Sequence, residues 1–368
     1  MRSKVKQNLL KYLRDYGQKS FREVPFSEVD ALLLAELSYL KMAGIVPGFN
    51  KGQGVGWRDM AEHPDAEQLF TDPIYGKNHR RVFNFVLRSN RYQNVRVNYY
   101  VEWFNEETQV QFSAVTFLLG KTSVYVAYRG TDESIIGWKE DFNMAYMKSI
   151  PSQRRALAYL KGVARYTQGR LILGGHSKGG NLAIYAGTNG PKEIQKRIRR
   201  IYSFDGPGFQ KSFYEKRGFV RIQDRYCKIV PEESLVGMLF ANYRNYRIVE
   251  SYRTGFGQHD LLQWKIRNGR FMYRKDLNRK SKRQAAIFNA WFNSLSGEQV
   301  FVFVETLYDL LCAAHVQSVA QLLKAPFGIL RKMASGFRKL DKGKRGIIWG
   351  SMRKLVSTVL AFIKPGKK

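Results

Sequence analysis

A serine set between glycines is the residue best suited to covalent chemistry in this sequence. Gly175-His-Ser-Lys-Gly179 has the form G-x-S-x-G, with Ser177 at its centre. The apolar run 171–173 precedes it as a predicted buried strand, and residues 181–186 follow with the small and apolar side chains of a helix. A strand, a sharp turn and a helix in this order expose a serine nucleophile and point the helix N-terminus at developing negative charge. The alternative interpretation is a glycine-rich turn in which the serine only caps the helix.

A serine nucleophile needs a base, and the sequence has five histidines. His259 follows the last predicted strand, so it alone fits the order serine, acid, histidine. The other four are predicted to have other roles: His176 is too close in sequence to reach Ser177, His63 and His79 are expected at the surface, and His315 is expected to pack within a helix.

The acid of such a triad must orient the imidazole and stabilise its cation. Asp205 ends the predicted strand 200–204 and begins a Gly-Pro-Gly turn, whereas Glu232 and Glu233 end the next strand. Asp205 is preferred because its short side chain sits in a turn that favours a fixed geometry, and Glu233 stays open as the alternative acid. A plain turn residue and two solvent-exposed glutamates are the simpler interpretations.

An oxyanion hole needs two donors. The backbone N–H of Lys178, which follows the nucleophile, is the first expected donor. The loop at Gly130 and Thr131 is expected to supply the second, with the Thr131 hydroxyl as an additional donor. Asp132 and Asp141 are expected to hold that loop or to cap a helix.

Alternating strand and helix patterns position these side chains. Residues 95–99 and 110–117 predict a hairpin, and a helix is expected at about 152–168. Further strands are predicted at 122–128, 171–173, 200–204, 225–230 and 243–252. The pattern predicts an α/β fold of the α/β-hydrolase type, with a mainly parallel sheet flanked by helices. Ligands bind such sheets beyond the carboxyl ends of the strands, where the candidate residues all lie.

Composition restricts the class of protein and its partners. The chain has 368 residues, 44% of them hydrophobic, with 62 Lys and Arg against 30 Asp and Glu, a net charge of +32. Such an excess favours anionic partners, although it also serves solubility. Two cysteines, no signal-peptide pattern and no long apolar run predict a cytoplasmic protein without a transmembrane helix.

Three segments are predicted: a basic N-terminal arm at 1–20, a hydrolase domain at 21–315 that begins with a helical segment, and a basic helical extension at 316–368. In the extension, one helical face carries apolar side chains and the rest is basic. That pattern fits a helix lying on anionic lipid at the inner membrane face, or a helix packed on the domain with a solvated basic side, which is preferred. The apolar face consists of Ile348, Met352, Leu355, Val356, Val359 and Ile363.

Several motifs resemble known families. Tyr128-Arg-Gly-Thr-Asp132 and Gly175-His-Ser-Lys-Gly-Gly180 are similar to motifs of the class 3 lipases. More of the chain, roughly 20–315, resembles the bacterial Mbeg1-like family, an α/β-hydrolase group. The motifs that carry this resemblance are Phe26-Ser-Glu-Val-Asp30, Gln111-Phe-Ser-Ala114, Gly175-His-Ser-Lys-Gly-Gly-Asn-Leu-Ala183, Asp205-Gly-Pro-Gly-Phe209, Ser234-Leu-Val-Gly237 and Gln258-His-Asp260.

The resemblance implies a serine esterase or lipase with Ser177 as nucleophile and His259 as base. Class 3 lipases place an aspartate after the strand that corresponds to 225–230, where this chain has Ser234. The resemblance therefore implies that the acid has moved to Asp205 or Glu233, or is absent.

Two functions follow as hypotheses. The first is hydrolysis of a carboxylic ester of a lipid or small molecule, without metal or cofactor. The second is a catalytically lapsed fold that binds anionic lipid or another anionic partner; no specific nucleic acid is expected. For the first hypothesis, apolar residues between 209 and 242 predict either a lid over an acyl pocket or ordinary core: Phe209, Phe213, Met238, Leu239 and Phe240.

Overall fold

The computed structural model describes residues 6–49, 52–105, 110–131, 135–144, 146–240, 246–316 and 326–363. Residue contacts divide the chain into two compact units. The first comprises residues 1–103, 112–130 and 152–278, and the second comprises 104–111, 131–151 and 279–368.

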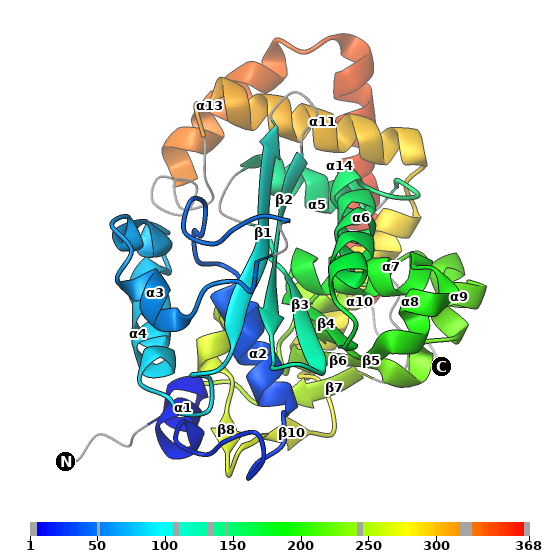
Figure 1. Cartoon of the computed structure of the whole chain (residues 1–368). Coiled ribbons are helices and arrows are strands. Elements are labelled where there is room, and N and C mark those ends of the chain that lie inside the picture. The colour runs from blue at the N-terminus through cyan, green and yellow to red at the C-terminus, as the bar shows by residue number, and fades with distance from the viewer. Residues whose placement is uncertain are drawn as a thin grey trace, which may run out of the picture. The chain divides into compact units, whose positions relative to one another are not determined.

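A mainly parallel sheet is the centre of the first unit (Figure 1). In the described chain it has eight strands in the order β1-β2-β3-β4-β5-β6-β7-β10. Strands β3 to β7 pair in parallel, whereas β2 with β3 and β7 with β10 pair antiparallel. Beside it, β8 (Ile266–Arg267) and β9 (Arg270–Phe271) form a small antiparallel pair. The bounds in the large sheet are β1 Arg96–Asn105, β2 Val110–Leu118, β3 Ser123–Tyr128, β4 Arg170–His176, β5 Ile198–Phe204, β6 Tyr226–Pro231, β7 Tyr246–Val249 and β10 Tyr273–Arg274.

Helices cover both faces of the sheet because its central strands are apolar on both sides. The Tyr125 hydroxyl donates to the carbonyl of Ala31 in α2 (Glu28–Leu37) at 2.9 Å. Tyr128, of opposite parity along β3, donates to the carbonyl of Ala156 in α6 (Pro151–Tyr166) at 3.0 Å. Successive side chains of a strand point to opposite faces, so α2 and α6 lie on opposite sides. The predicted mainly parallel α/β architecture is confirmed.

The remaining short elements of the first unit connect the strands or cover their ends. They are α1 Leu9–Tyr16, α3 Trp57–Ala61, α4 Gly76–Leu87, α7 Lys178–Asn189, α8 Lys192–Arg197 and α9 Arg217–Val220, and the 3₁₀ turns η1 Ala66–Phe70, η2 Lys211–Glu215, η3 Gln223–Arg225, η4 Val236–Met238, η5 Gly255–His259 and η6 Leu261–Gln263.

Residues Leu9–Tyr16 form helix α1, unlike the loose arm predicted for residues 1–20. Helix α1 buries Leu9, Tyr12 and Leu13 in the main core and lies beside β8 (Figure 1). Its apolar residues recur at the spacing of one helical face, while Lys11 and Arg14 occupy the other side. The basic residues therefore coat an amphipathic helix rather than marking a solvated tail.

The motif at the start of α2 is a buried structural junction. Ser27 and Asp30 form a capping box, in which each side chain accepts from the other residue's backbone N–H. The fully buried Asp30 carboxylate also accepts from the Arg91 guanidinium at 2.7 Å and from the Tyr12 and Tyr92 hydroxyls. These contacts tie α1, α2 and the segment before β1 together.

The second unit is helical in most of its described length. It contains α5 Ile135–Asn143, α10 Arg279–Asn293, α11 Gly297–Ala313, α13 Pro326–Arg338 and α14 Lys342–Ile363. Trp291, Phe292, Val300 and Val304 form its main apolar cluster. Helices α10 and α11 thus belong with the C-terminal helices, and the division at 278 differs from the predicted domain boundary at 315. None of the described helices is long and apolar enough to cross a membrane.

Candidate active site

The backbone at Ser177 has the sharp turn expected of a nucleophile. Ser177 follows β4 directly, precedes the first residue of α7, and has φ 54° and ψ −131°. Non-glycine residues rarely occupy this positive-φ region, and such strain clusters at functional sites. A Cβ at Gly175 would lie 2.4 Å from the carbonyl carbon of Gly179, so the turn closes only with glycine there. The parallel sheet and this strand–turn–helix together form an α/β-hydrolase fold.

Strand register brings Ser177 beside Asp205. His176 pairs with Phe204 in the parallel ladder of β4 and β5, so the residues that follow each lie at the same edge. The Ser177 N–H donates to the Phe204 carbonyl at 2.9 Å. Asp205 also has a positive φ, 49°, and its N–H donates to the Ile229 carbonyl at 2.8 Å.

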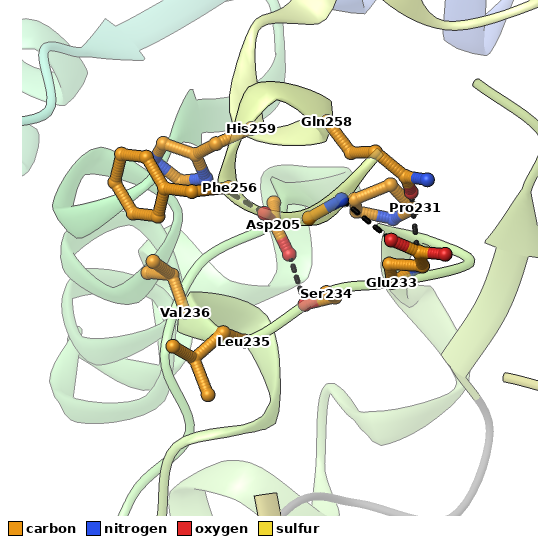
Figure 2. A pocket seen from close by; sticks show the side chains of 10 residues that line it. Asp205, Pro231, Glu233, Ser234, Leu235, Val236, Phe256, Gln258 and His259 are labelled. Atoms are coloured by element: carbon orange, nitrogen blue, oxygen red, sulfur yellow. Dashed lines mark hydrogen bonds and ion pairs between the residues drawn. The ribbon is translucent and has the colours of Figure 1, made fainter. Parts of the chain in front are cut away.

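The structure joins His259 to Asp205 (Figure 2). The Nδ1 atom of His259 lies 2.6 Å from Oδ2 of Asp205, which is almost completely buried. The His259 ring also lies against the ring of His176, the residue before Ser177, with centroids 4.3 Å apart. The acid, the histidine and the strained serine turn therefore meet at one edge of the sheet.

Glu233 points to other partners. Its carboxylate accepts from the Gly255 N–H at 2.5 Å and from the Asn278 side chain at 3.0 Å. The Glu233 N–H donates to the side-chain oxygen of Gln258 (Figure 2). Glu232 pairs with Arg274. Of the carboxylates proposed from the sequence, only Asp205 pairs with His259 within the described part of the chain.

Two residues that sequence reasoning did not assign to the site hold the Asp205 carboxylate, and a third contacts one of them. Oδ1 accepts from the Ser234 hydroxyl at 2.5 Å and from the Gly237 N–H at 3.2 Å. The buried Lys228 ammonium donates to the Gly237 carbonyl at 2.6 Å. Burial lowers the pKa of Lys228 to about 7, and the nearby negative charge of Asp205 opposes that shift. We call Ser234, Gly237 and Lys228 the acid cradle. In the sequence, only the motif Ser234-Leu-Val-Gly237 pointed to the acid cradle. It was one of the motifs that resemble those of the Mbeg1-like family, but no role in the site was predicted for it.

The predicted oxyanion-hole residues fall in different units. Lys178 opens α7, where the first N–H groups of a helix have no intrahelical acceptor. Gly130 lies against the nucleophile turn, since a Cβ built on it would stand 3.1 Å from Cβ of Ser177. Thr131 belongs to the second unit, where its hydroxyl donates to Asp141 at 2.6 Å. That bond is the one expected of a side chain holding the loop, whereas Asp132 lies outside the described residues.

Two predictions about histidines were wrong. His79, expected at the surface, is buried with Nε2 3.4 Å from Oε1 of the equally buried Glu36. Burial raises the pKa of Glu36 to about 8 and lowers the pKa of His79 to about 4, so both groups favour their neutral forms. His315, expected to pack inside a helix, is exposed just beyond the end of α11 with φ 57°.

His176 also has a structural position that its sequence did not reveal. The Tyr39 hydroxyl lies 3.0 Å from Nδ1 of His176. Burial, followed by the charge of His259, holds the pKa of His176 well below its usual value. A neutral His176 can stand beside His259 without placing a second positive charge next to it.

Apolar groups surround the exposed edge of His259. Phe256 is 56% exposed and stacks on the imidazole at 5.6 Å between centroids. Leu235, 38% exposed, lines the same small pocket as His259 and Asp205 (Figure 2). In contrast, Phe209 and Phe213 are buried and stack on each other at 3.7 Å, which agrees with the core alternative for those two residues.

Comparison with known proteins identifies the family. The model of the Mbeg1-like family matches residues 86–309. The chain belongs to the Mbeg1-like family. The resemblance inferred from the sequence motifs is thereby confirmed.

Several solved structures with detectable similarity are lipases. M37 lipase is 15% identical, with a TM-score of 0.37, over 58% of this chain and 70% of that one. The Rhizomucor miehei lipase in its propeptide complex is 15% identical, with a TM-score of 0.35, over 61% and 67% of the two chains. A lipase from Rhizopus microsporus var. chinensis is 14% identical, with a TM-score of 0.31, over 55% and 72%. No curated protein gives a significant match to the sequence.

Proposed function

We propose that this Mbeg1-like protein is a serine hydrolase that cleaves a carboxylic ester through an acyl-enzyme. The observation that carries the proposal is the 2.6 Å contact between His259 and the buried Asp205, beside the strained turn of Ser177. A serine turn alone would fit a helix cap, but a histidine held by a buried carboxylate next to that turn is the arrangement of an activated nucleophile.

The reaction follows from the roles of three side chains. Asp205 accepts a hydrogen bond from the N–H at Nδ1 of His259, which leaves Nε2 with its lone pair. Ser177 Oγ attacks the ester carbonyl carbon while its proton moves to Nε2. The tetrahedral intermediate expels the alcohol, which takes that proton from His259. Water then attacks the acyl-enzyme with His259 again as base, and the carboxylic acid leaves as Ser177 regains its proton.

Backbone donors would stabilise the oxyanion. The Lys178 N–H at the start of α7 has the position of the donor after the nucleophile, and the helix dipole favours negative charge there. Gly130, in the same unit as Ser177, is the proposed source of the second donor. The contact of Gly130 with the serine turn supports its part in this assignment.

The acid cradle is proposed to hold the Asp205 carboxylate in one rotation. Its two donors occupy Oδ1, so Oδ2 remains for His259. A buried carboxylate needs such hydrogen-bond donors, because burial removes the water that would otherwise solvate it. Lys228 adds a buried donor behind the Gly237 peptide and positive charge when protonated. We propose Ser234, Gly237 and Lys228 as positioning residues rather than as groups that touch substrate.

The substrate class is proposed from the apolar surroundings of His259. Phe256 and Leu235 are exposed side chains at the edge of the site, where solvent contact is unfavourable for them. They favour an ester with an apolar acyl or alkyl group over a charged one.

The proposal is tested with p-nitrophenyl esters of increasing acyl length. We expect the wild-type chain to release p-nitrophenolate, and Ser177→Ala and His259→Ala to lose turnover by at least about a thousandfold. Glu233→Gln, which leaves His259 and Asp205 untouched, is the matched control and should keep activity within a few-fold. Equal hydrolysis by wild type and Ser177→Ala, or no hydrolysis of any chain length by folded wild type, would overturn the proposal.

A further inference from the structure

Helix α14 in the second unit presents an apolar stripe to solvent. Trp349, Met352, Val356 and Leu360 are 59%, 37%, 55% and 52% exposed. Spacings of three, four and four residues place them along one side of the helix. We call these four residues the α14 stripe. It overlaps the apolar face predicted from the sequence at Met352 and Val356 only.

The opposite side of α14 fixes how the helix is turned within its unit. Ser351 is buried, and its carbonyl accepts from the Trp291 indole at 2.9 Å. Leu355 packs on the cluster that contains Trp291, and Lys354 donates to the Ser294 carbonyl at 2.7 Å. These contacts place the opposite side of α14 against the other helices of its unit, so the stripe faces away from them. The stripe is therefore a surface feature of the packed unit.

Positive charge borders the stripe. Lys342, Arg345 and Arg353 stand seven residues before, four before and four after Trp349, which places them along the same side of the helix. Across residues 326–363 the sequence has nine Lys and Arg against a single carboxylate, Asp341. This surface therefore consists of a row of apolar side chains with cations along its edges.

We propose that the α14 stripe is a docking surface for an anionic lipid bilayer, with the helix lying in the plane of the interface. A large aromatic residue and aliphatic side chains enter the boundary between headgroups and acyl chains, while Lys and Arg pair with anionic headgroups. Tryptophan favours this boundary because its ring is apolar and its N–H is polar. A second copy of the chain fits less well, because the cations that border each stripe would face one another.

The test is co-sedimentation of the full chain with phosphatidylcholine vesicles, with and without phosphatidylglycerol. We expect binding that requires the anionic lipid and weakens as salt rises. Trp349→Ser with Val356→Ser should lower the partition constant by about tenfold or more, since each buried apolar side chain contributes substantially to transfer. Arg345→Glu with Arg353→Glu should lower it by a similar factor, because each membrane-facing cation contributes roughly fivefold.

Matched controls lie in the other unit. Val220→Ser removes an apolar side chain that is 50% exposed, and Lys192→Glu reverses an exposed charge on α8. Neither should change binding by more than about twofold. Ser177→Ala should bind as wild type does, so failure of the proposed catalysis and failure of this proposal are separate results.

Three outcomes would overturn the proposal. The first is equal binding by wild type and both double variants. The second is a dimer in sedimentation velocity that the Trp349→Ser, Val356→Ser variant abolishes while vesicles are not bound, which would make the stripe an interface between copies. The third is binding of an RNA or DNA oligomer that the charge reversals abolish while vesicles are not bound, which would assign the surface to nucleic acid.

Discussion

Replacing Asp205 by asparagine tests which carboxylate serves His259, and the acid cradle dictates how the new amide must lie. Oδ1 of Asp205 accepts from two donors, the Ser234 hydroxyl and the Gly237 N–H. An asparagine keeps both bonds only if its carbonyl oxygen takes the Oδ1 position. Its NH₂ group then occupies the Oδ2 position, which lies 2.6 Å from Nδ1 of His259.

That orientation forces the wrong tautomer of His259. An NH₂ donor facing Nδ1 requires Nδ1 to be the acceptor, so the ring proton moves to Nε2, and Nε2 can no longer take the proton of Ser177. The equivalent change in a serine-protease triad lowers kcat by about 10⁴. At about 1.4 kcal/mol per tenfold change, this corresponds to roughly 5 kcal/mol of lost transition-state stabilisation.

The assay is p-nitrophenyl ester turnover by Asp205→Asn and Glu233→Gln, with circular dichroism and thermal unfolding to establish that both fold. We expect Asp205→Asn to lose about four orders of magnitude in kcat with a KM changed less than about threefold, because ground-state binding does not use the proton relay. Glu233→Gln should stay near wild type. Loss of activity in Glu233→Gln, with Asp205→Asn within tenfold of wild type, would refute the assignment of the acid.

Three further predictions concern the cradle and the edge of the site. The free energy of unfolding of wild type minus that of Lys228→Met should vary with pH. The Lys228 pKa is about 7 in the fold and near 10.5 when unfolded, so between these values the unfolded chain binds more protons. Wild type should therefore gain stability relative to the variant as pH rises, by at most about 1.4 kcal/mol per unit, and a flat difference in urea titrations would contradict this. Gly237→Ala should lower kcat at least about tenfold while thermal unfolding shows a folded chain, because a Cβ there would lie 2.3 Å from Oδ1 of Asp205; unchanged kcat would argue against the cradle. Phe256→Ala should raise KM severalfold for long acyl esters and little for acetate, and an equal effect at all lengths would exclude a contact with the acyl chain.

Local patterns made much of this arrangement predictable. The elbow at Ser177 was visible because glycine spacing, the apolar strand and the helix are all encoded within a short segment. The strand ends at Asp205 and near His259 followed from alternating elements, since the carboxyl ends of parallel strands share one edge.

What stayed undecided depended on how segments distant in sequence fold over one another. Asp205 and Glu233 both follow strands, so strand position does not tell which of them is the acid. The segment from Ser234 to Gly237 distinguishes them, because it folds over Asp205 and donates to its carboxylate. The burial of His79 likewise comes from its contact with Glu36 in another helix, which nothing in its own segment indicated. The sequence of α1 is rich in cations and so favours a loose arm, although Leu9, Tyr12 and Leu13 have helical spacing.

The central claim is that Ser177 is an activated nucleophile, and covalent labelling with a fluorophosphonate tests it most directly. Such a probe reacts with a serine that a base and an oxyanion hole have activated, whatever the natural substrate. The account predicts one adduct per chain, mapped to Ser177 by peptide mass spectrometry, and loss of labelling in both Ser177→Ala and His259→Ala. Folded wild type that stays unlabelled, or a label at another serine that survives Ser177→Ala, would contradict it.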